Sequence, residues 1–313
     1  MIKMIDFTSC RQIPGRAYNG ANGKKIAVEY NGAPYMLKFP PSGAGKPTDL
    51  SYTNSCFSEH IASSIFNMLG VTAQETMLGT FNVGGKAKVV CACRDFTVDG
   101  KLLHDFCSIK NTVLDSDSGG NGTELFDVLD TIEKQQFVDP VRLTAFFWDM
   151  FVIDAMLGNF DRHNGNWGFL SDAVSGETEI APVFDCGSCL LPQADERVMR
   201  DALTNKDAMN ARVFQFPTST LRQDGLKINY YDFLIKAVYT DCNAALKRIY
   251  GRMDMKRIRT FIDSVPYSSD LQKEFYDRYI ATRFDMIIRP AYEIAMSDEP
   301  DKFSAVRNAS GVP

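Results

Sequence analysis

The 313-residue chain has no apolar run of the roughly 18 to 20 residues that a membrane-spanning helix needs. Near its N-terminus only Lys3 precedes Asp6, so the charged-then-apolar pattern of an export signal is missing. Basic residues are also scarce, with 34 Lys and Arg against 39 Asp and Glu and a net charge of −5. A nucleic-acid partner is not expected, because such proteins cluster cations against phosphates. These absences predict a cytoplasmic protein without a membrane span.

The eight cysteines lack the dense spacing of a disulfide-stabilised secreted protein, and several lie within apolar segments. We therefore expect reduced thiols. The segment Cys186-Gly187-Ser188-Cys189 matches a C-x-x-C pattern, which also occurs in redox and zinc sites. A zinc site needs a second pair, and Cys91-x-Cys93 has poor spacing for one. Metal or redox chemistry at these cysteines is the less favoured interpretation.

Residues 1–98 are expected to form a β-sheet with one helix. Asn31-Gly32 separates two strand-like runs, which is a strong signal for a β-hairpin. Apolar residues at helical spacing before Gly70 predict a helix that carries Glu59 near its start. The expected elements are strands at 25–30, 34–39, 76–83 and 87–93 and a helix at 57–69.

Beyond Arg94 the pattern turns helical, beginning after a loop at 115–122. Asp139-Pro140 suits the start of a helix that reaches Leu157 and is apolar on nearly every side, as a buried helix would be. A hairpin is predicted on either side of the turn-rich stretch 171–178. The other expected helices are at 230–250, 254–262 and 268–296, with Pro290 kinking or splitting the last.

The loop residues after Gly158 contain the most informative pattern of the chain. Asp161 is followed five residues later by Asn166, and a second aspartate, Asp185, precedes Gly187. Asp161 is placed to act as a general base, while Asn166 and Asp185 offer the oxygen ligands that Mg²⁺ prefers. Asp, Asn and Gly also fill ordinary turns, but both aspartates follow a Phe, which favours a phosphotransferase site.

Phosphoryl transfer also needs contacts to the nucleotide phosphates. Lys38, at the end of an apolar strand, is expected to pair with phosphates of ATP, and Glu59 is expected to hold it in place. The alternative for Lys38 is a solvated surface charge. His163 is expected to brace the catalytic loop by hydrogen bonds. A glycine-rich turn whose backbone N–H groups could approach phosphate is formed by Gly20, Ala21, Asn22 and Gly23.

These residues resemble the HipA-like kinases, whose catalytic loop reads Asp-x-His-x-x-Asn and whose metal-binding Asp follows a short hairpin. Residues 147–169 and 180–195 carry a closer resemblance to the cell-translocating members of that family. The resemblance implies an α+β, two-lobed, protein-kinase-like fold with a small β-rich N-lobe, residues 1–98, and a larger helical C-lobe, residues 99–313. It also implies ATP, Mg²⁺, and phosphorylation of Ser or Thr in proteins, including the kinase itself.

By the same resemblance, adenine would bond to the backbone of an interlobe hinge made of Cys93, Arg94, Asp95 and Phe96. HipA toxins have a long N-terminal subdomain that helps to bind an antitoxin, whereas only residues 1–19 precede Gly20 here. An antitoxin partner is therefore not expected. Gly165 stands where HipA usually has Lys, which removes one cation from the phosphate site. The family implies a translation-associated protein substrate, and the cell-translocating members imply a host protein and export without a classical signal.

Two alternatives differ in class from a protein kinase. Asp161-Arg162-His163-Asn164-x-Asn166 also echoes phosphoinositide kinases, which suggests a kinase for a lipid or small molecule. The net negative charge and the lack of a basic membrane-binding helix count against a lipid kinase. The other alternative is a non-catalytic pseudokinase that binds a partner. A pseudokinase usually lacks at least one catalytic residue. This chain has the full set, which is Lys38, Glu59, Asp161, Asn166 and Asp185.

Overall fold

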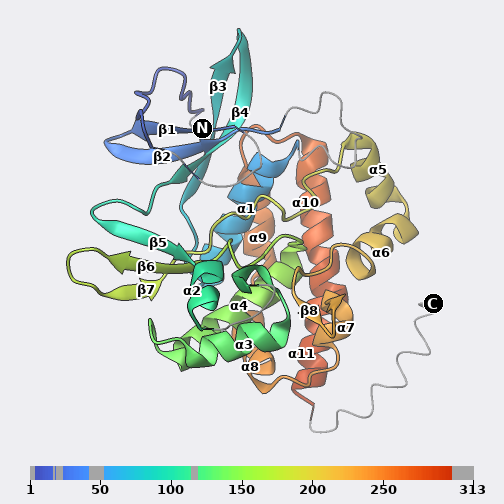
Figure 1. Cartoon of the computed structure of the whole chain (residues 1–313). Coiled ribbons are helices and arrows are strands. Elements are labelled where there is room, and N and C mark those ends of the chain that lie inside the picture. Colours follow the sequence, from blue (N-terminus) through green and yellow to red (C-terminus); the bar gives the residue numbers. More distant parts are fainter. Residues whose placement is uncertain (1–3, 17, 19–23, 42–52, 114–118, 298–313) are drawn as a thin grey trace.

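The computed structural model describes residues 4–16, 18, 24–41, 53–113 and 119–297. Figure 1 shows a four-stranded sheet at one end of the molecule and a larger body of helices beside and below it. Helix α1 (Ser55–Met68) lies between the two and contacts strands of that sheet. The expected α+β class is confirmed. Within the described residues, no helix is long and apolar enough to cross a membrane.

The four-stranded sheet is antiparallel in the order β1-β2-β4-β3. Its strands are β1 (Lys25–Tyr30), β2 (Ala33–Lys38), β3 (Thr76–Val83) and β4 (Lys86–Arg94). Asn31 and Gly32 have φ angles of 51° and 76°, as a two-residue hairpin turn requires. This turn pairs Lys25 with Lys38. Directly paired residues point to the same face, so the two lysines lie side by side.

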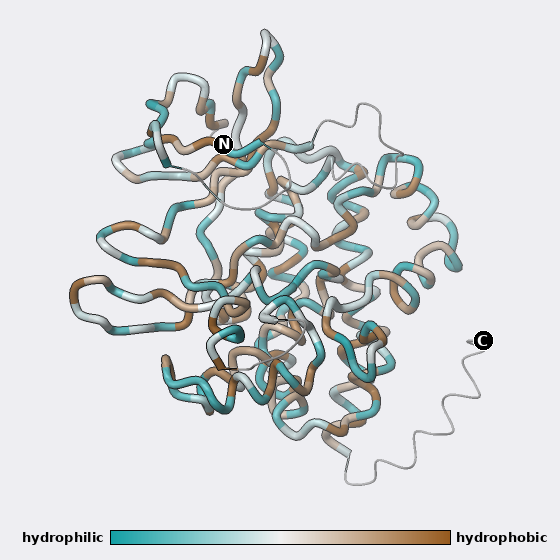
Figure 2. The backbone as a smooth tube through the Cα atoms, viewed as in Figure 1, coloured by the Kyte–Doolittle hydropathy of each residue, from teal (hydrophilic) through white to brown (hydrophobic). Residues whose placement is uncertain are grey.

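Both faces of this sheet are buried. Along β4 the side chains alternate between two apolar clusters: Cys91 and Cys93 pack with α1 and the helical body, whereas Val90 and Ala92 pack beneath Phe7. In Figure 2 apolar residues recur along the strands of the sheet and along the helices, interleaved with polar ones. One face of the sheet therefore packs against the helical body. Helix α1, which carries the residue that pairs with Lys38, lies against this face.

Helix α4 (Pro140–Leu157) has the predicted bounds. The Asp139 side chain accepts hydrogen bonds from the N–H groups of Val141 and Arg142, and Pro140 occupies the first turn. Every residue from Phe147 to Leu157 is buried. The helix ends at Gly158, whose φ of 64° lets the chain turn directly into the loop that contains Asp161.

The segment after Arg94 is more regular than the sequence predicted. Strand β5 (Lys101–Asp105) and helix α2 (Phe106–Val113) stand where the sequence analysis assigned no element. The strand is mostly exposed and gains its structure by pairing with β6 (Gly168–Asp172), which also pairs with β7 (Thr178–Ile180). Such long-range pairing leaves little local signal. The expected hairpin is confirmed, and the division of the chain between residues 98 and 99 stays a prediction.

The rest of the described chain is mostly helical, as predicted. The remaining elements are η2 (Gly119–Asn121), α3 (Leu125–Lys134), α5 (Glu196–Thr204), α6 (Lys206–Phe214), β8 (Arg222–Gln223), β9 (Leu226–Lys227), α7 (Tyr230–Leu234), α8 (Thr240–Tyr250), α9 (Met255–Ser264), α10 (Asp270–Arg283), η3 (Phe284–Ile288) and α11 (Arg289–Ala295).

One predicted helix was wrong, and another is interrupted near its proline. The single helix expected at 230–250 is two helices, because Ala237 between them has a φ of 50° that no helix contains. The helix expected at 268–296, with Pro290 kinking or splitting it, is divided into α10 and α11 close to Pro290. The chain widens into one π-helical stretch, η3, immediately before α11, which accommodates the proline.

Replacing Gly158 tests how tightly the end of α4 is packed. A Cβ atom at Gly158 would collide with the hydroxyl of Tyr279, and its positive φ disfavours any side chain. We expect Gly158→Ala to lower the free energy of unfolding by about 1–3 kcal/mol more than Gly176→Ala does. Gly176 has a similar φ of 74° with nothing near its Cβ position. Chemical denaturation measures both, and equal losses would show that Tyr279 does not constrain this turn.

Candidate active site

A cavity of about 720 Å³ lies where the four-stranded sheet meets the loops at the ends of α4 and β7. Eight of the predicted site residues line it: Lys38, Glu59, Asp95, Phe96, Asp161, His163, Asn166 and Asp185. Cys93 and Arg94, predicted for the hinge, are not among its lining residues. The predicted glycine-rich turn, residues 20–23, lies outside the described residues.

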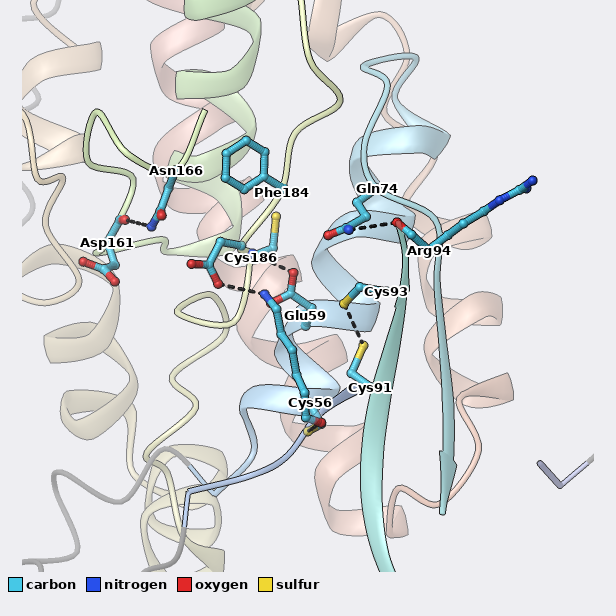
Figure 3. Close-up of polar contacts among 12 residues, drawn as sticks. Cys56, Glu59, Gln74, Cys91, Cys93, Arg94, Asp161, Asn166, Phe184 and Cys186 are labelled. Atoms are coloured by element: carbon cyan, nitrogen blue, oxygen red, sulfur yellow. Dashed lines mark hydrogen bonds and ion pairs between the residues drawn. The ribbon is translucent and has the colours of Figure 1, made fainter. Parts of the chain in front are cut away.

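Lys38 is held between two carboxylates. Its Nζ atom is 2.8 Å from Oε2 of Glu59 and 2.8 Å from Oδ1 of Asp185. Figure 3 labels Glu59 among the polar contacts of this site. Only 1% of the Glu59 side chain is exposed, and its other oxygen, Oε1, accepts a hydrogen bond from the backbone N–H of Cys186 at 3.0 Å. Glu59 therefore links the strand lysine to the loop that carries Asp185. The alternative interpretation of Lys38 as a solvated surface charge is wrong.

The charges of this group support one another. Burial alone would lower the pKa of Lys38, but Asp185 and Glu59 outweigh it and raise that pKa well above its usual value. Lys38 in turn lowers the pKa of Asp185 to about 2, against the effect of burial. At neutral pH the lysine is a cation and Asp185 is a carboxylate. A cation for phosphates and an anion for a metal thus stand side by side.

Asp161 lies on the opposite wall of the cavity, in the loop after α4. Its backbone carbonyl accepts a hydrogen bond from Nδ2 of Asn166 at 2.8 Å, which leaves Oδ1 of Asn166 as the atom able to bind a cation. Burial raises the pKa of Asp161, while His163 lowers it and Asp185 raises it further. Among the described residues no hydrogen-bond donor holds the Asp161 carboxylate, so it is available to accept a proton.

Arg162 joins the two loops and was given no role by the sequence. Its Nε atom pairs with Asp154 at 2.9 Å, and Nη1 donates to the carbonyl oxygens of Asn166 at 2.8 Å and Phe184 at 2.6 Å. Its Nη2 atom contacts the sulfur of Cys186 at 3.3 Å. The signal that could have identified it is Asp154, a buried acid in an apolar helix, which requires a cation nearby.

Lys25 is a second cation that the sequence analysis missed. It lines the cavity from β1, directly opposite Lys38. Burial lowers the pKa of Lys25, Asp185 raises it, and the like charge of Lys38 lowers it again. The hairpin at Asn31-Gly32 could have revealed this pair, because a two-residue turn fixes which residues face each other. HipA usually has a lysine at the position of Gly165. Lys25 adds a positive charge to a site in which Gly165 supplies none.

The hinge residues divide into two pairs. Cys93 and Arg94 are part of the sheet: Cys93 pairs with strands on both sides, and the Arg94 N–H bonds to the carbonyl of Glu75 at 2.8 Å. The Asp95 N–H bonds to the carbonyl of Pro34 at 3.0 Å. The backbone N–H groups of Arg94 and Asp95 are thus committed to the sheet. Asp95 and Phe96 lie at the cavity wall.

The Asp95 side chain also has structural partners. It pairs with Nε of Arg16 at 2.6 Å and accepts a hydrogen bond from the Tyr18 hydroxyl at 2.8 Å. A further pair of bonds comes from the N–H and hydroxyl of Thr97. Burial opposes ionisation of Asp95, yet these donors lower its pKa. Asp95 therefore fastens the segment of Arg16 and Tyr18 to the end of β4.

The lining residues fit a magnesium nucleotide. The cavity has the size of a small-molecule site, and Lys25 and Lys38 supply positive charge within it. Within the described residues, no cluster of three or more His, Cys, Asp or Glu side chains could hold a metal ion. Magnesium does not need one, since one or two protein oxygens and substrate phosphates complete its shell. Asn166 and Asp185 offer those oxygens. The cysteines beside them, Cys186 and Cys189, are buried free thiols.

Comparison with known proteins identifies the family. The HipA-like C-terminal domain profile matches residues 17–247. The chain belongs to the HipA-like family. It is 50% identical to the serine/threonine-protein kinase CtkA of Helicobacter pylori strain J99 over 296 residues, which cover 93% of this chain and 89% of CtkA. The predicted resemblance to HipA-like kinases and to their cell-translocating members is confirmed, and the chain is a kinase.

Solved structures of HipA-like proteins have the same fold. The crystal structure of the proinflammatory kinase CtkA of Helicobacter pylori superimposes with a TM-score of 0.89 and 49% identity, covering 94% of this chain and 98% of that one. HipA of Shewanella oneidensis MR-1, solved with HipB and operator DNA, gives a TM-score of 0.55 at 13% identity, covering 95% of this chain and 76% of that one. The HipA-like chain thus has the predicted two-lobed kinase architecture.

Removing the Arg162 guanidinium tests whether it holds the site together. Arg162→Met would leave the Asp154 carboxylate buried without its cation, so we expect the free energy of unfolding to fall by about 3–5 kcal/mol. The double variant Arg162→Met with Asp154→Asn, which removes both charges, should recover part of that loss. Chemical denaturation of the three proteins checks this. A double variant less stable than Arg162→Met would contradict the buried ion pair as the cause.

Proposed function

We propose that this HipA-like kinase transfers the γ-phosphoryl group of ATP, with magnesium, to Ser and Thr hydroxyls of proteins, including its own. One observation carries the proposal: a lysine held by a buried glutamate shares a cavity with two aspartates and an asparagine. CtkA, which is 50% identical to this chain over 296 residues, is a serine/threonine-protein kinase. That relationship favours a protein acceptor over the lipid or small-molecule acceptor weighed from the sequence.

The residues have separate roles in this proposal. Lys38, oriented by Glu59, contacts the phosphates, and Lys25 beside it adds charge from the paired strand. Asn166 and Asp185 supply oxygen ligands for magnesium, which would neutralise phosphate charge when bound. Asp95 and Phe96 face the base of the nucleotide from the hinge. His163 accepts a hydrogen bond from the Gly165 N–H at 3.0 Å and so shapes the catalytic loop.

Asp161 is the proposed base. The acceptor oxygen forms a bond to the γ-phosphorus while the bond from that phosphorus to the leaving β-phosphate oxygen breaks, and the hydroxyl proton passes to the Asp161 carboxylate. The raised pKa of Asp161 suits this role, because a carboxylate buried against its usual preference gains more by taking a proton. Lys38, whose pKa is raised by its carboxylate partners, stays cationic beside the leaving phosphates throughout.

Phosphoryl transfer by single-residue variants tests the assignment. With γ-labelled ATP and magnesium, we expect the purified protein to label itself or a generic protein acceptor on Ser or Thr. Asp161→Asn and Asp185→Asn should each lose on the order of a hundredfold in rate or more, because one removes the base and the other a metal ligand. Phosphoamino-acid analysis identifies the acceptor residues, and chelation of magnesium should abolish the signal.

Asp263→Asn is the matched control. Asp263 is exposed on α9 and is not among the cavity's lining residues, so the same chemical change should leave the rate unaltered. Wild-type labelling rates in Asp161→Asn and Asp185→Asn would contradict the proposed site. Labelling of an added lipid or small alcohol, with no protein labelled, would contradict the proposed acceptor.

A further inference from the structure

The loop after α4 brings four residues to the cavity wall on which the proposed base lies. They are Asp161, His163, Gly165 and Asn166. The acceptor hydroxyl meets the γ-phosphoryl group beside the base, so this wall also has to hold oxygens of that group. The hydrogen-bond donors of the wall decide how it can do so.

The backbone donors of these four residues are all in use within the loop. The Asp161 N–H bonds to the Asn159 side chain at 3.0 Å. The His163 N–H bonds to the Asp161 carbonyl and the Asn166 N–H to the His163 carbonyl, each at 2.9 Å. The Gly165 N–H bonds to Nδ1 of His163 at 3.0 Å. A donor for a phosphate must therefore come from a side chain.

Two side chains of this wall carry donors. The Asn166 amide donates to the Asp161 carbonyl at 2.8 Å, as Figure 3 shows, and Asn166 is only 5% exposed. His163 is exposed, and among the described residues Gly165 is the one hydrogen-bond partner of its ring. Because a backbone N–H can only donate, Nδ1 must accept and carries no hydrogen. The neutral ring then has its hydrogen on Nε2, which is the donor that this wall keeps available.

A side chain at position 165 would displace this ring. A Cβ atom at Gly165 would be 3.0 Å from Cε1 and 3.1 Å from Nδ1 of His163, closer than such atoms ordinarily approach. The backbone itself does not require a glycine, since the φ of Gly165 lies outside the left-handed region. The small residue thus leaves room for the ring, while its N–H holds Nδ1.

We propose that His163 donates a hydrogen bond from Nε2 to an oxygen of the γ-phosphoryl group, and that Gly165 positions the ring for this contact. The inference rests on the proposed ATP site and gives that site a donor on the wall of the base. The sheet supplies the cations Lys25 and Lys38, whereas the loop supplies a neutral donor. Besides bracing the loop, the bond from Gly165 selects the ring form whose Nε2 carries the hydrogen.

Two substitutions separate this role from bracing of the loop. Asparagine has its amide oxygen at the distance of Nδ1, so His163→Asn can keep the bond from Gly165 but has no donor at the position of Nε2. Glutamine is one carbon longer and its amide nitrogen reaches the position of Nε2, so His163→Gln can keep the donor. A ring that only braces the loop predicts wild-type behaviour of His163→Asn. The proposed contact predicts that His163→Asn is the impaired variant.

Binding of ADP and of β,γ-imido-ATP, each with magnesium, isolates the contact, because only the second nucleotide has a γ-phosphoryl group. By titration calorimetry, we expect His163→Asn to bind β,γ-imido-ATP about ten- to a hundredfold more weakly than the wild type, since a hydrogen bond to a charged group is lost. Its affinity for ADP should stay within about twofold of the wild type, which also shows that the variant is folded. His163→Gln should bind β,γ-imido-ATP about three- to tenfold more tightly than His163→Asn.

His104→Asn is the matched control. His104 is also exposed, and its Nε2 atom lies 2.7 Å from the Ser171 hydroxyl, but it is not among the cavity's lining residues. The same change there should leave both affinities at their wild-type values. Wild-type affinity of His163→Asn for β,γ-imido-ATP, or an equal loss for both nucleotides, would overturn the proposal.

Gly165→Ala tests the positioning role of the glycine. Displacing the ring should weaken the binding of β,γ-imido-ATP, as His163→Asn does, and leave that of ADP unchanged. In the double variant with His163→Asn, the loss should be close to that of His163→Asn alone, since no ring remains to be displaced. Losses that add in full would overturn the role of Gly165.

The outcomes separate this inference from the function on which it rests. If the wild-type protein binds neither nucleotide and labels no protein, the ATP site fails and the role of His163 fails with it. If the wild type binds both and transfers phosphate, while His163→Asn keeps its affinity for β,γ-imido-ATP, the ATP site stands and only the role of His163 fails.

Discussion

The site depends on the buried carboxylate of Glu59. A carboxylate with 1% of its side chain exposed is tolerable only when both oxygens have donors, and here Lys38 satisfies one and the Cys186 N–H the other. These two donors come from the sheet and from the loop of the helical body that carries Asp185. One buried charge therefore sets the position of the lysine, the metal-site loop and α1 relative to one another.

A second buried ion pair, between Asp154 and Arg162, holds the two loops of the site. Asp154, in α4, holds Arg162, and Arg162 reaches the backbone of both the catalytic loop at Asn166 and the metal-site loop at Phe184. The loops need such a brace because their backbone is irregular; Asp185 itself has a φ of 56°, which is unfavourable for an aspartate. Packing does not hold these residues in place alone. Hydrogen bonds to charged groups supply the geometry that the catalytic chemistry uses.

Much of this could be predicted from the sequence. The helix from Pro140 to Leu157 was visible because its cap, its first-turn proline and its closing glycine are all local. Lys38, Glu59, Asp161, Asn166 and Asp185 were identifiable because their order and residue types match the chemistry. Strand β5 and the role of Arg162 could not be predicted, because both depend on partners that are distant in sequence. Cys93 and Arg94, predicted for the hinge, bond within the sheet, which residue type alone does not reveal, and their contact with adenine stays a prediction.

We propose that Lys38 and Asp185, which are paired in this structure, are the two halves of a magnesium nucleotide site. A crystal structure with magnesium and a non-hydrolysable ATP analogue tests this most directly. We expect Lys38 to keep its bond to Glu59 and to contact the phosphates, while Asp185 leaves Lys38 and binds the metal beside Asn166. A nucleotide bound elsewhere, with the 2.8 Å pair between Lys38 and Asp185 unchanged, would contradict it.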